Sequence, residues 1–435
     1  MKTFWIALFT LLCFSVIRAQ PDEPILEQAL FDMPDISFRK LSKPGDNYLQ
    51  YGLKIRQPLD HQDPSKGTFF QQVILTHRGF DNPTVMITNG YDIDLDKNEI
   101  TEILHANELN IEYRYFGASS PDLLQWEYLT YEQVAADLHR INQMFKKLYR
   151  GKWISSGISR GGQTSIIYRY FYPRDVDLSV PYVAPMIKGL EDERIFSFLD
   201  TMGTDACRNR IHDFQLDLLK KEKEILDKLK WYTKGKEFDF NYLGNLGKAF
   251  EYAVLEYPFS FWQVTDFPCD SVPRHPSVDE GLEHLLKVVN IDLFADESMQ
   301  DYAPHYYQAL TEGGYYGYDA KPFTKYLRYI MDPEPSAIFP PQPIALKPFT
   351  GSLMDRIINW LYEEGNNFLY IYGGRDTWSA CRVEVSPGVN SKLYVVPGAN
   401  HFKARIKFMP PGMQEDFSRT LENMIQIKTD LNALP

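Results

Sequence analysis

The stretch Gly157-Ile158-Ser159-Arg160-Gly161 decides which fold this sequence can adopt. It follows a short apolar run that begins at Trp153 and precedes a helical pattern that continues through Phe171. Glycines two positions before and two positions after a serine let the chain turn sharply from a strand into a helix, and this turn presents the hydroxyl at the carboxyl end of the strand. The helix N-terminus also favours negative charge that develops beside it. Ser159 is therefore the candidate nucleophile, and the alternative is a serine in an ordinary loop.

Short apolar runs alternate with helical patterns on both sides of this motif. Residues 131–149, for example, carry apolar side chains at the spacing of one helix face. Such alternation predicts a parallel sheet covered by helices, and two turn-bounded runs at residues 48–56 and 68–77 predict an antiparallel opening. The expected parallel strands are residues 85–88, 111–115, 153–156, 178–183, 368–372 and 393–396.

The middle of the chain has a different residue pattern. Residues 191–346 contain charged helical stretches and many aromatic residues, but the alternation of strand and helix stops there and returns only afterwards. The predicted class is α/β, with an α/β-hydrolase fold: a mostly parallel central sheet flanked by helices, interrupted by an inserted helical cap. The predicted parts are a signal peptide at residues 1–19, core at 20–190, cap at 191–346, and core again at 347–435.

A serine hydroxyl needs a base, and hydrolases of this fold deliver the remaining partners in the order acid, then histidine. His401 is the only histidine after His305, and it follows the strand expected at residues 393–396. Asp376 follows the strand expected at residues 368–372, where it can orient the base. The alternatives are a surface histidine, and an aspartate that caps a turn or helix. The rival carboxylates are Glu363, Glu364 and Glu384.

Two backbone N–H groups are expected to bind the oxyanion. One belongs to the residue after the nucleophile, which is Arg160, and the other comes from a loop that follows an early strand. Gly90 and Tyr91 occupy that loop, although Asn-Gly is also a common turn sequence. The expected reaction needs no cofactor, and the sequence has neither a His-Glu-x-x-His helix nor the paired-cysteine spacing of a metal site.

The N-terminus has the features of a secretory signal. Lys2 precedes an apolar run at residues 4–17, and the small residue Ala19 offers a cleavage site. We expect a secreted or periplasmic protein with no membrane span after the signal is removed, and an uncleaved anchor is the alternative. The formal net charge of -12 argues against a nucleic-acid partner, because such binding needs clustered Lys and Arg.

Three cysteines remain once Cys13 leaves with the signal. They are Cys207, Cys269 and Cys381, so at most one disulfide can form within the chain. Pairing of Cys207 with Cys269 would link parts of the middle region, but connectivity cannot be deduced from sequence.

The residues after Ser159 extend the motif into a longer signature. It comprises Gly157-Ile158-Ser159-Arg160-Gly161-Gly162-Gln163-Thr164, Phe171-Tyr172-Pro173, Asp175-Val176-Asp177 and Tyr182-Val183-Ala184-Pro185. This signature resembles the secreted tripeptidyl aminopeptidase family of serine peptidases, which is related to the prolyl carboxypeptidase and dipeptidyl peptidase II group. The segment Glu112-Tyr113-Arg114-Tyr115-Phe116-Gly117 is similar to a Glu-His-Arg segment of the lysosomal relatives. The sequence departs from the pattern at Tyr113, where histidine is usual, and at Arg160, where lysine is common.

The resemblance implies a serine exopeptidase that releases short peptides, tripeptides in particular, from a free N-terminus and accepts proline beside the cleaved bond. Peptides with a free N-terminus would be its partners. Glu112 and Arg114 are candidate substrate-binding residues, and the alternative for Glu112 is a structural pairing with Arg114 or nearby backbone. Aromatic residues at 257–262 and 306–318 are expected either to line a pocket or to form cap core. The competing functions are a carboxylic-ester hydrolase with the same triad and an inactive hydrolase-fold binding protein.

Overall fold

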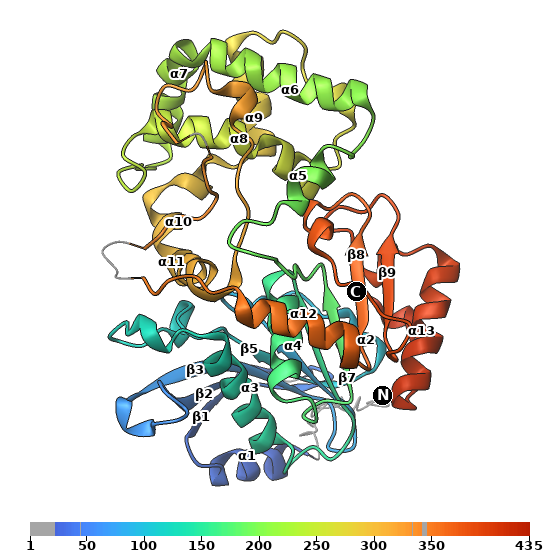
Figure 1. The fold of residues 1–435 in the computed structure, drawn as a ribbon. Helices are drawn as coiled ribbons and strands as arrows, with labels where there is room; N and C mark the ends of the chain where they lie inside the picture. The colour runs from blue at the N-terminus through green and yellow to red at the C-terminus, as the bar shows by residue number, and fades with distance from the viewer. Residues whose placement is uncertain (1–21, 44, 333, 342–345) are drawn as a thin grey trace, which may run out of the picture.

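A computed structural model describes residues 22–435, except residues 44, 333 and 342–345 (Figure 1). The predicted signal peptide, with Cys13 and the cleavage site at Ala19, lies outside the described residues. Among the helices of residues 22–435 that the structure describes, none has both the length and the apolar character needed to cross a membrane.

The core of the molecule is a nine-stranded sheet with the order β1-β2-β3-β5-β4-β6-β7-β8-β9. Strands β1, β2, β3 and β5 pair antiparallel, whereas all pairs from β5 through β9 are parallel. This arrangement confirms the predicted α/β class and its antiparallel opening. The strands are β1 (Ile36–Lys40), β2 (Leu49–Pro58), β3 (Thr68–His77), β4 (Thr84–Thr88), β5 (Asn107–Ile111), β6 (Trp153–Ile158), β7 (Leu178–Tyr182), β8 (Leu369–Gly373) and β9 (Lys392–Val396).

Helices cover both faces of this sheet. Successive side chains of a strand point to opposite faces, and both faces of the parallel strands carry apolar side chains that the helices bury. Leu369 and Ile371 of β8 pack in the cluster that contains α2 and α13, whereas Tyr370 packs in the cluster that contains α4 and α12. Helices α1 and α3 cover the antiparallel end on the same side as α4. The helices are α1 (Glu23–Asp32), α2 (Glu99–Ile103), α3 (Tyr131–Phe145), α4 (Arg160–Phe171), α12 (Ser352–Glu364) and α13 (Pro411–Ile425).

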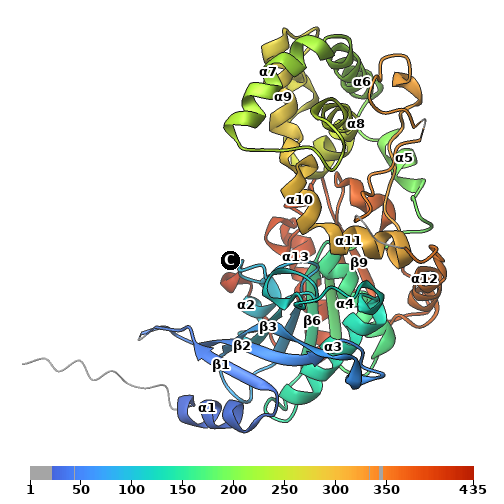
Figure 2. The ribbon, with the colours of Figure 1, turned by 90° about the vertical axis from the view of Figure 1, so that its left-hand side faces the viewer.

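The remaining helices follow β7 and precede α12, within the range 191–346 expected to form the cap. Figures 1 and 2 show α6 to α9 gathered beyond one end of the sheet, with α10 and α11 between them and the core. The cap has a hydrophobic core of its own, which also includes Trp378 and Cys381 from the loop after β8. The cap helices are α5 (Arg194–Leu199), α6 (Asp205–Lys220), α7 (Glu222–Gly235), α8 (Leu246–Val264), α9 (Val278–Val288), α10 (Asp296–Asp301) and α11 (Ala303–Gln308).

One predicted strand was wrong. The apolar run at residues 111–115 is not a strand; β5 lies four residues earlier, at Asn107–Ile111. The strand tolerates buried polar residues because their side chains bond the neighbouring backbone: Asn107 Oδ1 accepts the Arg78 N–H at 2.8 Å. After Ile111 the chain leaves the sheet, and Tyr115 takes a positive φ of 69° that a regular strand cannot contain.

Candidate active site

Ser159 occupies a sharp turn between β6 and α4. Its φ of 58° and ψ of −124° are strained for a residue with a side chain, and its backbone N–H donates to the Tyr182 carbonyl at 2.8 Å. The turn therefore lifts the Ser159 side chain out of the strand direction while the backbone stays tied to β7. This is the geometry expected of a nucleophile elbow.

The glycines of the motif are required by close backbone contacts. A Cβ atom at Gly157 would lie 2.5 Å from the Thr88 carbonyl oxygen, and a Cβ at Gly161 would lie 2.4 Å from the same atom. The Thr88 hydroxyl in turn donates to the Gly161 carbonyl at 2.8 Å. The elbow is thus pressed against the carboxyl end of β4, and only glycine fits at either position.

Asp376 and His401 lie together at the ends of β8 and β9. The His401 Nδ1 and Asp376 Oδ2 atoms are 2.8 Å apart, and both side chains are buried. The other carboxylate oxygen of Asp376 accepts the Trp378 N–H at 3.1 Å and caps a short helical turn. Asp376 therefore makes both contacts that the sequence offered as alternatives. One carboxylate oxygen contacts His401, and the other caps a turn.

The three candidate residues share one edge of the sheet. Strands β6, β7, β8 and β9 are neighbours and run parallel, so their carboxyl ends meet at that edge. Within the described residues, no hydrogen bond joins the Ser159 hydroxyl to His401, and the His401 Nε2 atom has no protein partner. Serine–base contacts often tighten only when substrate is bound. The Nε2 atom is thus available to accept a proton.

The loop that carries His401 is held by the cap. The His401 N–H donates to the carbonyl of Gln263, in the last turn of α8, at 2.8 Å. Asn400 Oδ1 accepts the Lys403 N–H at 2.9 Å, and its amide donates to the Thr265 carbonyl at 3.3 Å. The position of the candidate base therefore depends on helix α8.

The two segments expected to bind the oxyanion lie against each other. A Cβ at Gly90 would come within 2.6 Å of Arg160 Cβ, so the close approach requires glycine. Within the part of the chain that the structure describes, the backbone N–H groups of Gly90, Tyr91 and Arg160 have no acceptor. The Arg160 guanidinium donates to the Gly90 carbonyl. The C=O and N–H groups of a trans peptide point in opposite directions, so the N–H of Tyr91, in the same peptide, points away from the guanidinium.

Comparison with known proteins identifies the family. The model of the family described as PS-10 peptidase S37 matches residues 19–424. The chain belongs to this family. It is a serine peptidase with the α/β-hydrolase fold, and the predicted peptidase class is confirmed.

A curated relative and two solved structures accompany this match. The chain is 32% identical over 396 residues to a prolyl tri/tetrapeptidyl aminopeptidase of Streptomyces mobaraensis, covering 89% of this chain and 82% of that protein. It is similar to a proline iminopeptidase of Mycobacterium smegmatis (12% identity, 90% and 99% coverage, TM-score 0.37). It is also similar to acetyl xylan esterase 1 of Thermoanaerobacterium sp. JW/SL YS485 (11% identity, 93% and 94% coverage, TM-score 0.36).

Tyr113 and Arg160, where the sequence departs from the family pattern, are in contact. The Arg160 guanidinium carbon lies 4.4 Å from the centre of the Tyr113 ring and 5.0 Å from that of Tyr91. The guanidinium and the Tyr113 hydroxyl both donate to Gln308 Oε1, the latter at 2.8 Å. The two departures therefore form a single cation–π arrangement next to Gly90 and Tyr91, the loop expected to bind the oxyanion. Sequence could name both positions but not their contact.

The structure corrects the expectation for Arg114. Its side chain is fully buried, and all five of its N–H groups have protein acceptors: two on the Asp137 carboxylate and three on backbone carbonyls. No donor is left for a substrate, so Arg114 is structural. Glu112 is also buried, but it accepts from the Ser119 hydroxyl at 2.6 Å instead of pairing with Arg114. Burial raises the pKa of Glu112.

A cavity of about 560 Å³ lies under the cap, beside the candidate triad. Tyr91 of the oxyanion loop lines it, as do Trp378 and Phe402, which follow Asp376 and His401 closely in the chain. Residues of α8 also line it, and Glu256 is one of them. The aromatic segments at 257–262 and 306–318 contribute both to this lining and to the cap core, so the two expectations for them hold together. Sequence reasoning missed Glu256, although an acid within the apolar run at residues 249–262 was a signal.

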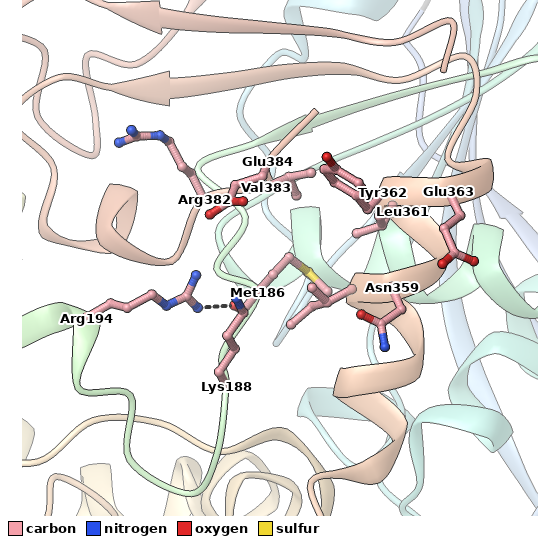
Figure 3. A pocket seen from close by; sticks show the side chains of 11 residues that line it. Met186, Lys188, Arg194, Asn359, Leu361, Tyr362, Glu363, Arg382, Val383 and Glu384 are labelled. Carbon is pink, nitrogen blue, oxygen red and sulfur yellow. Dashed lines mark hydrogen bonds between the residues drawn. The ribbon is translucent and has the colours of Figure 1, made fainter. Parts of the chain in front are cut away.

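A second pocket, of about 190 Å³, lies between α12 and the segment after β7 (Figure 3). Arg194 donates to the Met186 carbonyl at 2.6 Å across one side of this pocket. Glu363 and Glu384, two rivals of Asp376, line it and not the cavity under the cap. They are therefore poor candidates for orienting His401.

The cysteine pairing left open by the sequence is resolved within the cap. Cys207 of α6 forms a disulfide with Cys269, just after α8, and the two Cα atoms are 5.4 Å apart. Cys381 is buried and free. The disulfide ties the start of α6 to the loop that follows α8.

Proposed function

We propose that this peptidase releases tripeptides or tetrapeptides from free N-termini through a Ser159-His401-Asp376 triad. The observation that carries the proposal is the His401–Asp376 contact at the sheet edge where the strained Ser159 turn also lies. The name of the Streptomyces mobaraensis relative supports the length of the product and a preference for proline.

The chemistry follows from the roles of these atoms. Ser159 Oγ attacks the carbonyl carbon of the third residue while His401 Nε2 accepts the hydroxyl proton. The negative oxygen is stabilised by the N–H groups of Arg160 and Tyr91, at the N-terminus of α4. His401 then protonates the leaving amine, and water releases the peptide from the serine ester. Asp376 holds the Nδ1–H and stabilises the imidazolium.

The cap supports the choice of short peptides over folded proteins. Helix α8 contacts the histidine loop directly, and the cavity beside the triad is lined by cap residues such as Tyr316. A folded protein surface cannot enter such a cavity, whereas a free peptide end can. The apolar walls suit a proline ring next to the cleaved bond.

The test uses chromogenic tripeptides that end in Pro, Ala or Phe, each with a free and an N-acetylated N-terminus, together with a short acyl ester. We expect cleavage of the free-amine peptides, fastest with Pro. Ser159→Ala should abolish turnover and labelling by an organophosphonate, and Asp376→Asn should lower kcat by about 10⁴-fold with the fold intact. Turnover by the Ser159→Ala variant, or hydrolysis of the ester alone, would refute the proposal.

We also propose that the enzyme acts after export. The apolar run at residues 4–17 and the small residue at Ala19 support this proposal. N-terminal sequencing of the protein made by its own cells tests it. A mature chain that begins at Gln20, found outside the cytoplasm, is expected, and an intact N-terminus on cytoplasmic protein would contradict it.

A further inference from the structure

Glu256 is a buried carboxyl group on the wall of the cavity beside the triad. Only 4% of the residue is exposed. Its two oxygens accept hydrogen bonds from the Ser260 hydroxyl at 2.6 Å and the Tyr316 hydroxyl at 2.8 Å. These neutral donors orient the carboxylate but supply no positive charge.

Within the described part of the chain, no cationic side chain pairs with this group. Among the residues that the structure describes, Glu256 forms no ion pair with Lys, Arg or His, and burial raises its pKa to about 7. Lys287 also lines the cavity, but its ammonium pairs with Glu283 at 2.6 Å. A carboxylate without a cationic partner is costly to bury, and such groups concentrate at binding sites. The geometry leaves room for a cation that comes from outside the chain.

Resting on the proposed function, we propose that Glu256 binds the α-ammonium group of the substrate and thereby limits the released peptide to three or four residues. The substrate class is a peptide with a free, protonated N-terminus. The carboxylate would accept hydrogen bonds from the ammonium while keeping those from Ser260 and Tyr316.

The spacing along α8 fits this role. The Gln263 carbonyl holds the His401 N–H, and Glu256 lies seven residues before Gln263 on the same helix. At 1.5 Å per residue the two positions are about 10 Å apart along the axis. An extended peptide spans about 3.3 Å per residue, so three residues cover about 10 Å. The rise of α8 from Glu256 to Gln263, which holds the histidine loop, therefore matches the length of three extended residues.

The wall between Glu256 and the triad is aromatic. Phe259 stacks on Tyr316 with ring centres 4.1 Å apart, and Trp378, two residues after Asp376, lies 5.4 Å from Tyr316. Rings around a carboxylate favour an organic cation, because their faces are negative. The cavity also contains His305, whose buried Nε2 atom has no hydrogen-bond partner among the described residues. This nitrogen offers a further polar contact for a peptide group.

The test compares Glu256→Gln with the wild type on chromogenic peptides of one to five residues, each with a free or an acetylated N-terminus, and on a short acyl ester. We expect kcat/KM for free-amine tripeptides to fall about 30-fold to 1,000-fold, mainly through KM. The length preference should flatten, whereas ester hydrolysis and organophosphonate labelling of Ser159 should stay within threefold. Glu256→Asp keeps the charge, so it should retain the preference for free over acetylated peptides.

Glu312→Gln is the matched control. Burial raises the pKa of Glu312 to about 7 as well, but this carboxylate accepts the Tyr131 N–H at 2.8 Å and does not line the cavity. Glu112→Gln tests the rival carboxyl group, and loss of free-amine selectivity in this variant alone would overturn the proposal. Equal loss on all substrates in Glu256→Gln, or no loss, would also overturn it. A wild type that hydrolyses the ester but no free-amine peptide would instead refute the aminopeptidase function itself, and this inference with it.

Discussion

A pair of facing carboxyl groups in the cap should make its stability depend on pH. Glu222, the first residue of α7, has a side chain that is 1% exposed, and it faces Glu251 of α8. Glu251 accepts backbone N–H groups from the segment 328–330, including that of Ile330 at 2.6 Å. Burial first, and then the charge of Glu251, raise the pKa of Glu222 to about 7, while Arg328 opposes the shift.

The sign and size of the effect follow from this shift. Because the folded state holds the Glu222 proton more tightly than the unfolded chain does, the stabilisation is fully present below pH 4.5, the ordinary pKa of a glutamate, and is lost as the pH rises to about 7. A pKa raised from 4.5 to about 7 corresponds to at most about 3 kcal/mol, which belongs to the Glu222–Glu251 pair as a whole. In Glu222→Gln the amide can donate to Glu251 at every pH. The variant should therefore match the wild type near pH 4.5 and exceed its free energy of unfolding by up to about 3 kcal/mol at pH 8.

Urea unfolding of both proteins at pH 5, 6, 7 and 8 measures this difference. Glu224→Gln, an exposed neighbour on the same helix, is the control and should follow the wild type at every pH. A difference between Glu222→Gln and the wild type that does not change with pH would refute the reasoning, as would a less stable variant at pH 8.

Three further predictions follow from the site and the cap. Gly90→Ala should lower kcat by about 100-fold in a protein that still folds, because the new methyl group would meet Arg160 Cβ at 2.6 Å and displace the loop of Gly90 and Tyr91. Steady-state kinetics measures the loss and circular dichroism checks the fold. A loss of kcat below threefold would count against this role of the loop. The ratio of free-amine peptide turnover to ester turnover should fall as the pH drops below about 7, since protonated Glu256 cannot pair with an ammonium; a ratio that stays constant from pH 5 to 8 would contradict the pairing. Replacing Cys207 and Cys269 by serine opens a link with a sequence separation of 62 and should cost about 4 kcal/mol of stability in urea; an unchanged unfolding midpoint would show that the disulfide constrains nothing.

Local patterns were enough to predict the sheet where strands are apolar. The runs at 153–156, 178–183 and 393–396 match β6, β7 and β9 closely, because both faces of these strands are covered by helices. Strand β5 was misplaced because buried asparagines, Asn107 and Asn110, interrupt its apolar residues. Asn110 bonds the Asp94 carbonyl at 2.6 Å, and such a contact has no signature in the strand itself.

The candidate triad could be predicted from the sequence for a related reason. Each of Ser159, Asp376 and His401 follows its own strand, and parallel strands bring their carboxyl ends together whatever lies between them in the chain. The position of Glu256 in the cavity could not be predicted in this way. Its partner Tyr316 lies 60 residues away in the chain, and the two side chains meet only when the cap folds. The proposed substrate pocket therefore depends on how the cap packs, which local sequence patterns do not predict.

Helix α8 joins the two halves of the site, and its own continuity is maintained by another cap helix. Pro258 lies inside α8 between Glu256 and Gln263. A proline cannot donate to the carbonyl four residues earlier, which is that of Val254. The buried side chain of Gln215, on α6, donates to this carbonyl at 2.7 Å and replaces the missing bond. The spacing between the amine site and the histidine loop is therefore set by the packing of α6 on α8, so that substitutions in the cap can change the length of the released peptide while the triad stays intact.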